Sequence, residues 1–253
     1  MITSWLKVVF CKKVPFKDVI QIFLFRYIFK NKPFRINNIT FSDLDKTLYS
    51  TIKEIFYLQD YTPSGFEINK GDTVVDIGAH WGVFIAYAKV RGANKIIAFE
   101  PDKNNYKKTM FLIKQNNLRN ITVKNLAISS KKGYMTLMSE SNSRRNSLYF
   151  QQTEFPSEIT YSKVQTININ NALENINKID FLKIDAEGAE FDIIKSCNKE
   201  TFSKIKTIVL EYHLFDNHHI DELESILKKH YSICKNIPSK NSRLGYIYCK
   251  NDK

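Results

Sequence analysis

Four charged side chains crowd around a glycine in the stretch FLKIDAEGAEF, residues 181–191. The stretch begins as an apolar strand and then places four charges within eight positions: Lys183, Asp185, Glu187 and Glu190. Buried charges are costly unless they are paired or used chemically. This spacing therefore predicts either an ion-pair network that closes a strand end or a reactive site.

A second strand, ending in VLEYH, places Glu211 and His213 on one face. Because parallel strands end at a common edge, we expect these side chains to form a polar floor with Asp185 and Glu187. Asp185, Glu187 and His213 are the candidate general bases. An imidazole titrates near neutral pH, whereas a carboxylate would need a raised pKa. Lys183 is expected to pair with the buried acids and so offset the cost of burying their charge.

The stretch VVDIGAHWGVF predicts a cofactor site at the end of an earlier strand. Gly78 permits a tight turn and Gly82 a close helix approach, but the spacing is not the GxGxxG that binds a pyrophosphate. Asp76 suits a positively charged ligand, and Glu100 ends the next strand with two oxygens for ribose hydroxyls. Together they predict S-adenosylmethionine, which carries a ribose, an ammonium and a sulfonium but no phosphate.

Short strands that alternate with helices must position these residues. This rhythm predicts an α/β fold with a doubly wound, mostly parallel, Rossmann-like sheet. The last two segments, YSICKNI and RLGYIYCK, are expected to pair antiparallel at one edge, and two strands flank a polar loop within 133–172. We divide the chain into an N-terminal helical extension, 1–60, and a Rossmann-like domain, 61–253. The expected strands of the main rhythm are 73–79, 95–101, 121–128, 179–188 and 206–213, and the helices are 83–90, 103–117, 190–196 and 219–230.

Composition narrows the class of protein. The chain has 253 residues and a formal charge of +12, which favours anions at its surface. Lys, Asn and Ile are over-used throughout, so the charge is weak evidence for a nucleic-acid partner. The scattered cysteines contain no CxxC, which predicts reduced thiols, a cytoplasmic location and no zinc site. These are Cys11, Cys197, Cys234 and Cys249.

The first 30 residues repeat apolar side chains at helical spacing with lysines between them. Such a basic amphipathic segment either packs on the main domain or lies on a membrane surface. Its longest apolar run, VIQIFLF, is too short to span a bilayer, which takes about 20 residues. No small-residue cleavage site follows it, which disfavours a secretory signal.

With these pieces placed, the chain resembles the FkbM family of S-adenosylmethionine-dependent methyltransferases from about Gly71 to His213. The resemblance rests on GDTVVDIGAHWGVF, AFEPD, NLAIS, IDFLKIDAEGAEFDIIKS and VLEYH. It implies a seven-stranded sheet whose last strand is antiparallel and, typically, O-methylation of a hydroxyl on a sugar, lipid or polyketide. The family usually has Asn where this chain has His80, which leaves open the group that contacts the methionine end of the cofactor.

In the usual methyltransferase strand order, Asn125 and Ala127 would lie beside the adenine. The sequence thus predicts a methyltransferase that uses S-adenosylmethionine, a small-molecule or glycan hydroxyl as acceptor, and no metal. The predicted catalytic residues are Lys183, Asp185, Glu187, Glu211 and His213. The predicted cofactor contacts are Asp76, Gly78, Ala79, His80, Gly82, Glu100, Pro101, Asp102, Asn125, Ala127 and Asp185.

Several alternatives stay open. Asp185, Glu187 and Glu211 offer oxygen ligands for magnesium, but their spacing is not diagnostic. The loop SNSRRNS could form a lid whose arginines, Arg144 and Arg145, favour an anionic acceptor. The histidines of FDNHHIDE are expected at a helix start capped by residue 216 or 217.

Two further functions compete with O-methylation. A base methyltransferase usually has a proline- and aromatic-rich loop after the fourth strand, where this chain reads DAEG. A non-catalytic binding module with the same fold is disfavoured by the intact acidic cluster.

Overall fold

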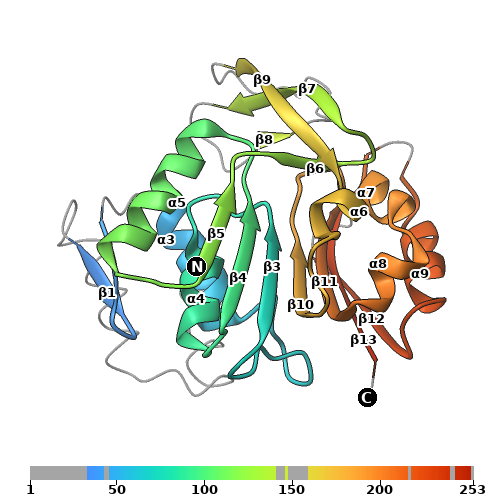
Figure 1. Ribbon diagram of the computed structural model, residues 1–253, viewed down its shortest axis with the longest axis horizontal. Helices are drawn as coiled ribbons and strands as arrows, with labels where there is room; N and C mark the ends of the chain where they lie inside the picture. Colours follow the sequence, from blue (N-terminus) through green and yellow to red (C-terminus); the bar gives the residue numbers. More distant parts are fainter. Residues whose placement is uncertain are drawn as a thin grey trace.

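A seven-stranded sheet forms the centre of the computed structural model (Figure 1). The structure describes residues 33–42, 46–140, 146–147, 159–215, 218–239 and 243–251. The strands of this sheet are β3 Thr73–Ile77, β4 Lys95–Phe99, β5 Ile121–Lys124, β10 Ile179–Ile184, β11 Ile205–His213, β12 Ile233–Pro238 and β13 Leu244–Lys250. Their spatial order is β12–β13–β11–β10–β3–β4–β5.

Strand direction follows the predicted pattern. The five strands from β11 to β5 are mutually parallel, and β13 runs antiparallel to both β11 and β12. The central strands are apolar because both of their faces are covered. The doubly wound, mostly parallel sheet and the antiparallel pairing of the last two segments are therefore confirmed.

Helices cover the two faces of the sheet (Figure 1). On one face, α4 and α5 pack with the side chains of Val74, Ile96 and Phe181. On the other face, four helices pack with Val75 and Leu182. The helices are α4 Val83–Val90, α5 Lys103–Gln115, α6 Ile169–Leu173, α7 Glu190–Ser196, α8 Lys199–Ser203 and α9 Ile220–Lys228. No helix among the described residues is long and apolar enough to cross a membrane.

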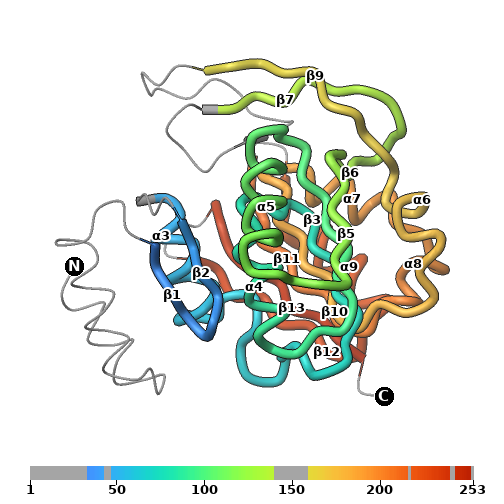
Figure 2. Tube along the Cα trace, turned by 60° about the vertical axis from the view of Figure 1, so that its left-hand side comes forward, coloured from blue at the N-terminus to red at the C-terminus, as the bar shows by residue number. Residues whose placement is uncertain are grey.

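A second, four-stranded sheet lies over the carboxyl ends of the central strands (Figures 1 and 2). Its strands are β6 Ala127–Ser129, β7 Gly133–Glu140, β8 Asn146–Ser147 and β9 Ile159–Asn168, in the order β6–β9–β7–β8. The expected single strand 121–128 is thus divided between the two sheets. The last two residues of the expected loop 141–147 form β8, and Arg144 and Arg145 lie outside the described residues.

The N-terminal segment differs from the helical extension that the sequence predicts. Strands β1 Phe34–Ile36 and β2 Ile39–Phe41 form a hairpin, and Asn37 and Asn38 both have positive φ. Two such residues are the usual signal for a two-residue hairpin turn, and the helical interpretation missed it. Helix α3, Lys46–Ile52, continues into the π-helix η1, Lys53–Leu58. The proposed membrane-surface segment, residues 1–30, lies outside the described residues.

This N-terminal segment belongs to the main core. Phe34, Phe41, Ile55 and Tyr61 are buried in the same cluster as the strands of the central sheet. The side chains on both sides of the predicted boundary at residues 60 and 61 therefore share one apolar core.

A disulfide contradicts the expectation that the cysteines are reduced thiols. Cys234 on β12 and Cys249 on β13 are direct partners in the strand register and form a disulfide, with Cα atoms 4.2 Å apart. Cys197 is free. The sequence predicted the antiparallel pairing of these segments, but not the register that places the two thiols opposite each other. The predicted cytoplasmic location consequently loses the support that it drew from reduced cysteines.

The start of α9 also differs from its prediction. His219 occupies the N-cap position and its side chain makes no capping hydrogen bond. The two predicted caps, residues 216 and 217, lie outside the described residues. The acids Asp221 and Glu222 occupy the first turn, where the helix dipole favours negative charge.

Candidate active site

A cavity of about 470 Å³ opens at the carboxyl ends of β3, β4, β10 and β11. The loops after β3 and β10 form its floor, the small sheet contributes Ala127 and Leu137, and η1 with Tyr61 forms another wall. Its lining contains six acidic side chains: Glu54, Asp60, Glu100, Asp185, Glu187 and Glu211. Lys183 and His80 are the basic residues among the described lining. A protein with a positive overall charge thus encloses an acidic cavity.

The loop after β3 is held close to the loop after β10. Gly78 has φ +81°, and a Cβ atom on it would lie 1.8 Å from the carbonyl oxygen of Asp185. Gly82 also has positive φ and precedes α4, where a Cβ would meet Thr109 at 3.0 Å. Only glycine meets both demands at position 78 without a shift of the backbone. Gly78 lines the cavity and Gly82 supports the loop from behind.

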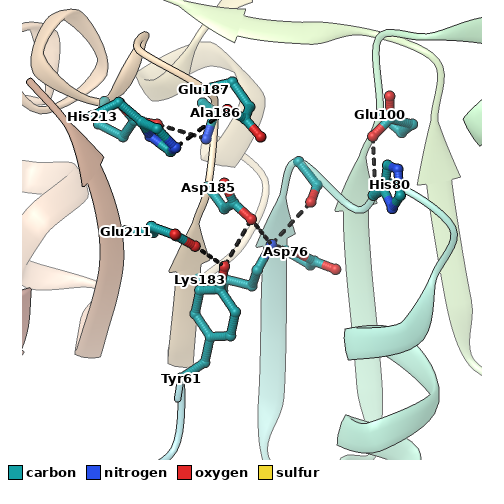
Figure 3. Close-up of polar contacts among 12 residues, drawn as sticks. Tyr61, Asp76, His80, Glu100, Lys183, Asp185, Ala186, Glu187, Glu211 and His213 are labelled. Carbon is teal, nitrogen blue, oxygen red and sulfur yellow. Dashed lines mark hydrogen bonds and ion pairs between the residues drawn. The ribbon is translucent and has the colours of Figure 1, made fainter. Parts of the chain in front are cut away.

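Glu100, directly after β4, links the loop after β3 to the segment that leads into α5 (Figure 3). Its Oε2 accepts a hydrogen bond from the backbone N–H of His80 at 2.6 Å, and its Oε1 accepts one from Asp102 at 2.9 Å. Burial raises the pKa of Glu100 to about 8, although these two N–H groups oppose the shift. Each carboxylate oxygen can accept a second hydrogen bond, so Glu100 keeps the capacity to bind hydroxyls.

Asp76 does not line the cavity, contrary to the role the sequence predicts. It is fully buried, and its Oδ1 accepts a hydrogen bond from Lys183 Nζ at 3.0 Å. The strand register places these residues side by side. Burial alone would lower the pKa of Lys183, but Asp76 and Asp185 raise it, so the ammonium stays charged. Asp76 therefore pairs with Lys183 behind the wall of the cavity.

Two other predicted cofactor contacts support the loops. Asp102 caps α5 by accepting hydrogen bonds from the N–H groups of Asn104 and Asn105. Asn125 donates to the carbonyl groups of Glu100 and Pro101. Neither Asp102 nor Asn125 lines the cavity. The remaining predicted contacts do line it: Ala79, His80, Pro101, Ala127 and Asp185.

On the β10–β11 side, a tyrosine links two acids (Figure 3). The Tyr61 hydroxyl oxygen lies 2.8 Å from Asp185 Oδ2 and 2.5 Å from Glu211 Oε2. Burial, followed by the Asp185 charge, raises the pKa of Glu211 to about 7. Burial also tends to raise the pKa of Asp185, but Lys183 and His213 hold it below its usual value. Asp185 is therefore ionised at neutral pH, while Glu211 is close to its titration midpoint.

His213, one of the candidate general bases, is fixed between the carboxyl groups of Glu187 and Glu190, and these contacts disfavour that role. Its Nδ1 lies 3.1 Å from Glu190 Oε1 and its Nε2 lies 3.2 Å from Glu187 Oε2. Burial would lower the pKa of His213, but the charges of Glu190 and Glu187 raise it well above the usual value. An imidazolium at neutral pH has both N–H groups engaged and cannot take a proton.

The loop after β10 depends on Glu190. Glu190 lies in the first turn of α7, and its side chain is fully buried. It accepts hydrogen bonds from the backbone N–H groups of Ala186 and Gly188. Glu187, the residue that turns the chain, has φ 48°, which is rare outside glycine. The Gly188 position leaves no room for a Cβ, which would lie 2.3 Å from the Phe215 ring.

Asp185, Glu190 and His213 bring three ligand atoms within 4.8 Å of one another, an arrangement that could suit a metal ion. However, the Oε1 atom of Glu190 already accepts from two backbone N–H groups and faces His213. The ligand atoms of Glu190 and His213 are thus already engaged in hydrogen bonds. We therefore interpret this cluster as a support for the loop after β10.

Tyr61 is the functional residue that sequence reasoning missed. It contacts Asp185 across 124 positions and Glu211 across 150 positions of the chain. No local motif surrounds it, and it is the first residue of the predicted Rossmann-like domain, 61–253, ahead of the first predicted strand. A tyrosine in an irregular segment carries no signal for such a contact.

The strand order, the glycine loop after β3 and the acid that ends β4 define the fold of the Rossmann-like methyltransferases. Residues 76–248, more than half of the chain, match the methyltransferase FkbM domain, and the protein therefore belongs to the FkbM methyltransferase family. It is accordingly an enzyme that uses S-adenosylmethionine. No curated protein sequence gave a significant match.

Several solved methyltransferase structures are similar to this chain at low sequence identity. The methyltransferase FkbM from Methylobacillus flagellatus KT is 15% identical with a TM-score of 0.52, and the alignment covers 92% of this chain and 60% of that chain. Precorrin-6y C5,15-methyltransferase from Geobacter metallireducens GS-15 is 15% identical with a TM-score of 0.44, covering 74% and 83%. A putative RNA methyltransferase from Pyrococcus horikoshii is 12% identical with a TM-score of 0.44, covering 93% and 99%.

The cavity fits the cofactor that the family uses. Glu100 offers acceptor positions for ribose hydroxyls, and the apolar wall of Phe99, Ala127, Ile128 and Leu137 suits an aromatic base. The acids beyond Gly78 suit the positive charge of a sulfonium. His80, with φ 50° and its ring stacked on Trp81, lies where the family usually has Asn.

Proposed function

We propose that the protein methylates a hydroxyl group on a sugar, glycan, lipid or other small acceptor. The observation that carries this proposal is the position of Glu211, which lines the same cavity as Glu100 and lies 2.5 Å from the Tyr61 hydroxyl oxygen. Burial and the Asp185 charge raise its pKa to about 7, which suits a base. A hydroxyl is a poor nucleophile until a base engages its proton, and a base that titrates near the working pH is the most effective.

When bound, S-adenosylmethionine supplies a methyl group on a positively charged sulfur. The task of the chain is to hold the acceptor in line and to remove its proton. In its ionised form, Glu211 takes the proton of the acceptor hydroxyl. Asp185 and Lys183 lie within the same contact network and fix the orientation of the site. Such positioning can contribute about 7–11 kcal/mol to the reduction of a reaction barrier.

The acid-rich lining also supports a neutral acceptor over a polyanion. Of the acids that line the cavity, Asp185 is ionised at neutral pH and Glu211 is partly so, and a phosphate next to them would meet like charge. The loop after β10 reads Asp-Ala-Glu-Gly and offers no aromatic ring on which a flipped base could stack. These features favour a small hydroxyl acceptor over a nucleic acid.

A labelling experiment tests the proposal. The protein is incubated with methyl-labelled S-adenosylmethionine and separate glycan, lipid, small-molecule, RNA and protein fractions. We expect the label in one of the first three fractions, in a form that resists mild alkali, because methyl ethers survive alkali and methyl esters do not. Label confined to RNA or protein, or lost in alkali, would contradict the proposal.

A further inference from the structure

The side chain of Tyr61 is held by packing on several sides. Its ring makes edge contacts with Phe84, at 5.7 Å between centroids, and with Tyr246, at 5.4 Å. Lys183 Nζ lies 5.0 Å from the ring centre. Only about 5% of the residue is exposed. The ring has little freedom to turn, so the hydroxyl group is fixed between the two acids (Figure 3).

The position of the Tyr61 hydroxyl group limits how its two acidic neighbours can be protonated. A phenol carries one proton, yet the Tyr61 oxygen lies within hydrogen-bond distance of two carboxyl oxygens. If the phenol donates to Asp185, the contact with Glu211 needs a proton on the Glu211 carboxyl group. If Glu211 loses that proton, the single phenol proton must serve one of two carboxylates.

We propose that Tyr61 is a positioning residue that joins Asp185 and Glu211 into a pair sharing one proton, and that it thereby sets the pH at which Glu211 can accept a proton from the acceptor. This inference rests on the proposed function of Glu211 as a base. It also gives the N-terminal segment a part in the reaction, because Tyr61 lies before the residues that match the family domain.

Other groups around Glu211 contribute to its field and stay unchanged in the test below. The acids are Glu54, Asp185 and Glu187, and the cations are Lys183 and His213. The other phenols are Tyr246 and Tyr248 of β13. Within the described part of the chain, neither Tyr246 nor Tyr248 forms a hydrogen bond with Glu211. Tyr61 is thus the phenol whose removal changes the hydrogen bonding of the acid.

The variant Tyr61→Phe keeps the ring and removes the hydroxyl group. While the pair shares its proton, the Tyr61 oxygen takes part in two hydrogen bonds, but only in one when both acids are ionised. Loss of the hydroxyl group therefore removes more from the protonated form of Glu211, and the midpoint of the pH–rate profile should fall by about one pH unit. Relative to its own plateau at high pH, the turnover number at pH 6 should therefore be about fivefold higher than that of the wild type. A rate that falls equally at every pH, or an unchanged midpoint, would overturn the proposal.

A matched control is Tyr87→Phe. Tyr87 is buried in the same core, and its hydroxyl group pairs with Thr62 at 2.7 Å and has no recorded contact with the acids. This variant also loses one buried hydroxyl group, but its pH midpoint should stay at the wild-type value. An equal shift in Tyr87→Phe would assign the effect to general loosening of the core.

Titration by ¹³C NMR of carboxyl-labelled protein separates this inference from the proposed function. The Glu211 resonance, assigned with Glu211→Gln, should titrate at lower pH in Tyr61→Phe whether or not any acceptor is methylated. If Tyr61→Phe does not fold, site-specific incorporation of 3-fluorotyrosine at position 61 alone provides the test. Its more acidic phenol is a stronger donor and should lower the Glu211 midpoint. An unchanged midpoint would overturn the proposal.

Discussion

At the scale of single residues, the site separates two acids by their surroundings. Asp185 lies beside Lys183 and stays ionised, whereas burial and the Asp185 charge bring the pKa of Glu211 to about 7. Environments that move two pKa values apart are the usual mark of an acid–base site. Glu211 therefore has the property of a base, and Asp185 helps to create it.

The variant Glu211→Gln removes this base while keeping the side-chain shape. We expect turnover to fall about 10²-fold or more, while cofactor affinity measured by calorimetry changes little. The wild-type rate should rise with pH through about 7, because Glu211 must lose its proton before it can accept another. The variant should lose this rise.

Glu54→Gln is the control, because Glu54 also lines the cavity and accepts a hydrogen bond from the Ser50 hydroxyl group. Its pH–rate profile should keep the rise with pH, with a midpoint slightly lower than in the wild type because Glu54 makes a small contribution to the field at Glu211. If Glu211→Gln retains both the rate and the pH dependence of the wild type, Glu211 is not the base.

Much of the site could be predicted from sequence, because strand parity decides which side chains share an edge. Lys183, Asp185 and Glu211 lie near where the alternation of β10 and β11 places them. The charge state of His213 could not be predicted, because it depends on the fold of the loop that brings Glu187 and Glu190 to its two nitrogens. Tyr61 was beyond reach because its contacts connect distant parts of the chain.

At the scale of elements, the loops after β3 and β10 meet at one point. Gly78→Ala would place a Cβ atom against the Asp185 carbonyl group, in a backbone region that side chains avoid. Either the loops separate or the protein loses stability. We expect a lower melting temperature and a loss of cofactor binding by calorimetry.

Gly65→Ala is the matched control for this prediction. Gly65 has φ +90°, but a Cβ atom there meets nothing within 4 Å. Its cost should be limited to backbone strain, about 1–2 kcal/mol, with cofactor affinity unchanged. Equal effects of the two variants would show that the close approach of the loops is not what requires Gly78.

The β12–β13 edge carries the disulfide between Cys234 and Cys249, which are 15 positions apart. Closing a loop of this length stabilises a protein by about 3 kcal/mol in the chain-entropy account. The double variant Cys234→Ser and Cys249→Ser should lose about that much free energy of unfolding under oxidising conditions, measured with denaturant. A reducing agent should weaken the wild type and leave the double variant unchanged. Equal stability of the two proteins without reductant would contradict this prediction.

At the scale of the whole molecule, the regular alternation of strands and helices made the central sheet predictable, since parallel βαβ units leave few arrangements. The N-terminal segment was not predictable in the same way. Its strands β1 and β2 have three residues each, too few to show a period. Their apolar residues were consequently assigned to a helix.

Deletion of residues 1–61 should prevent folding. The segment contributes Phe34, Phe41, Ile52, Ile55 and Tyr61 to the main core. Burial of each large apolar side chain is worth about 1.5–3 kcal/mol, and a whole domain has only about 5–15 kcal/mol of net stability. Circular dichroism and a thermal melt should show no cooperative transition. A stable, folded remainder would show that the segment is a separate unit.

The acidic lining of the cavity has a consequence for turnover between reaction cycles. Donation of the methyl group converts a sulfonium into a neutral thioether, so the nucleoside loses one positive charge while it is still inside. The carboxylates that attract the fresh cofactor then hold the spent one less strongly. Exchange of product for substrate is thus favoured by the chemistry itself.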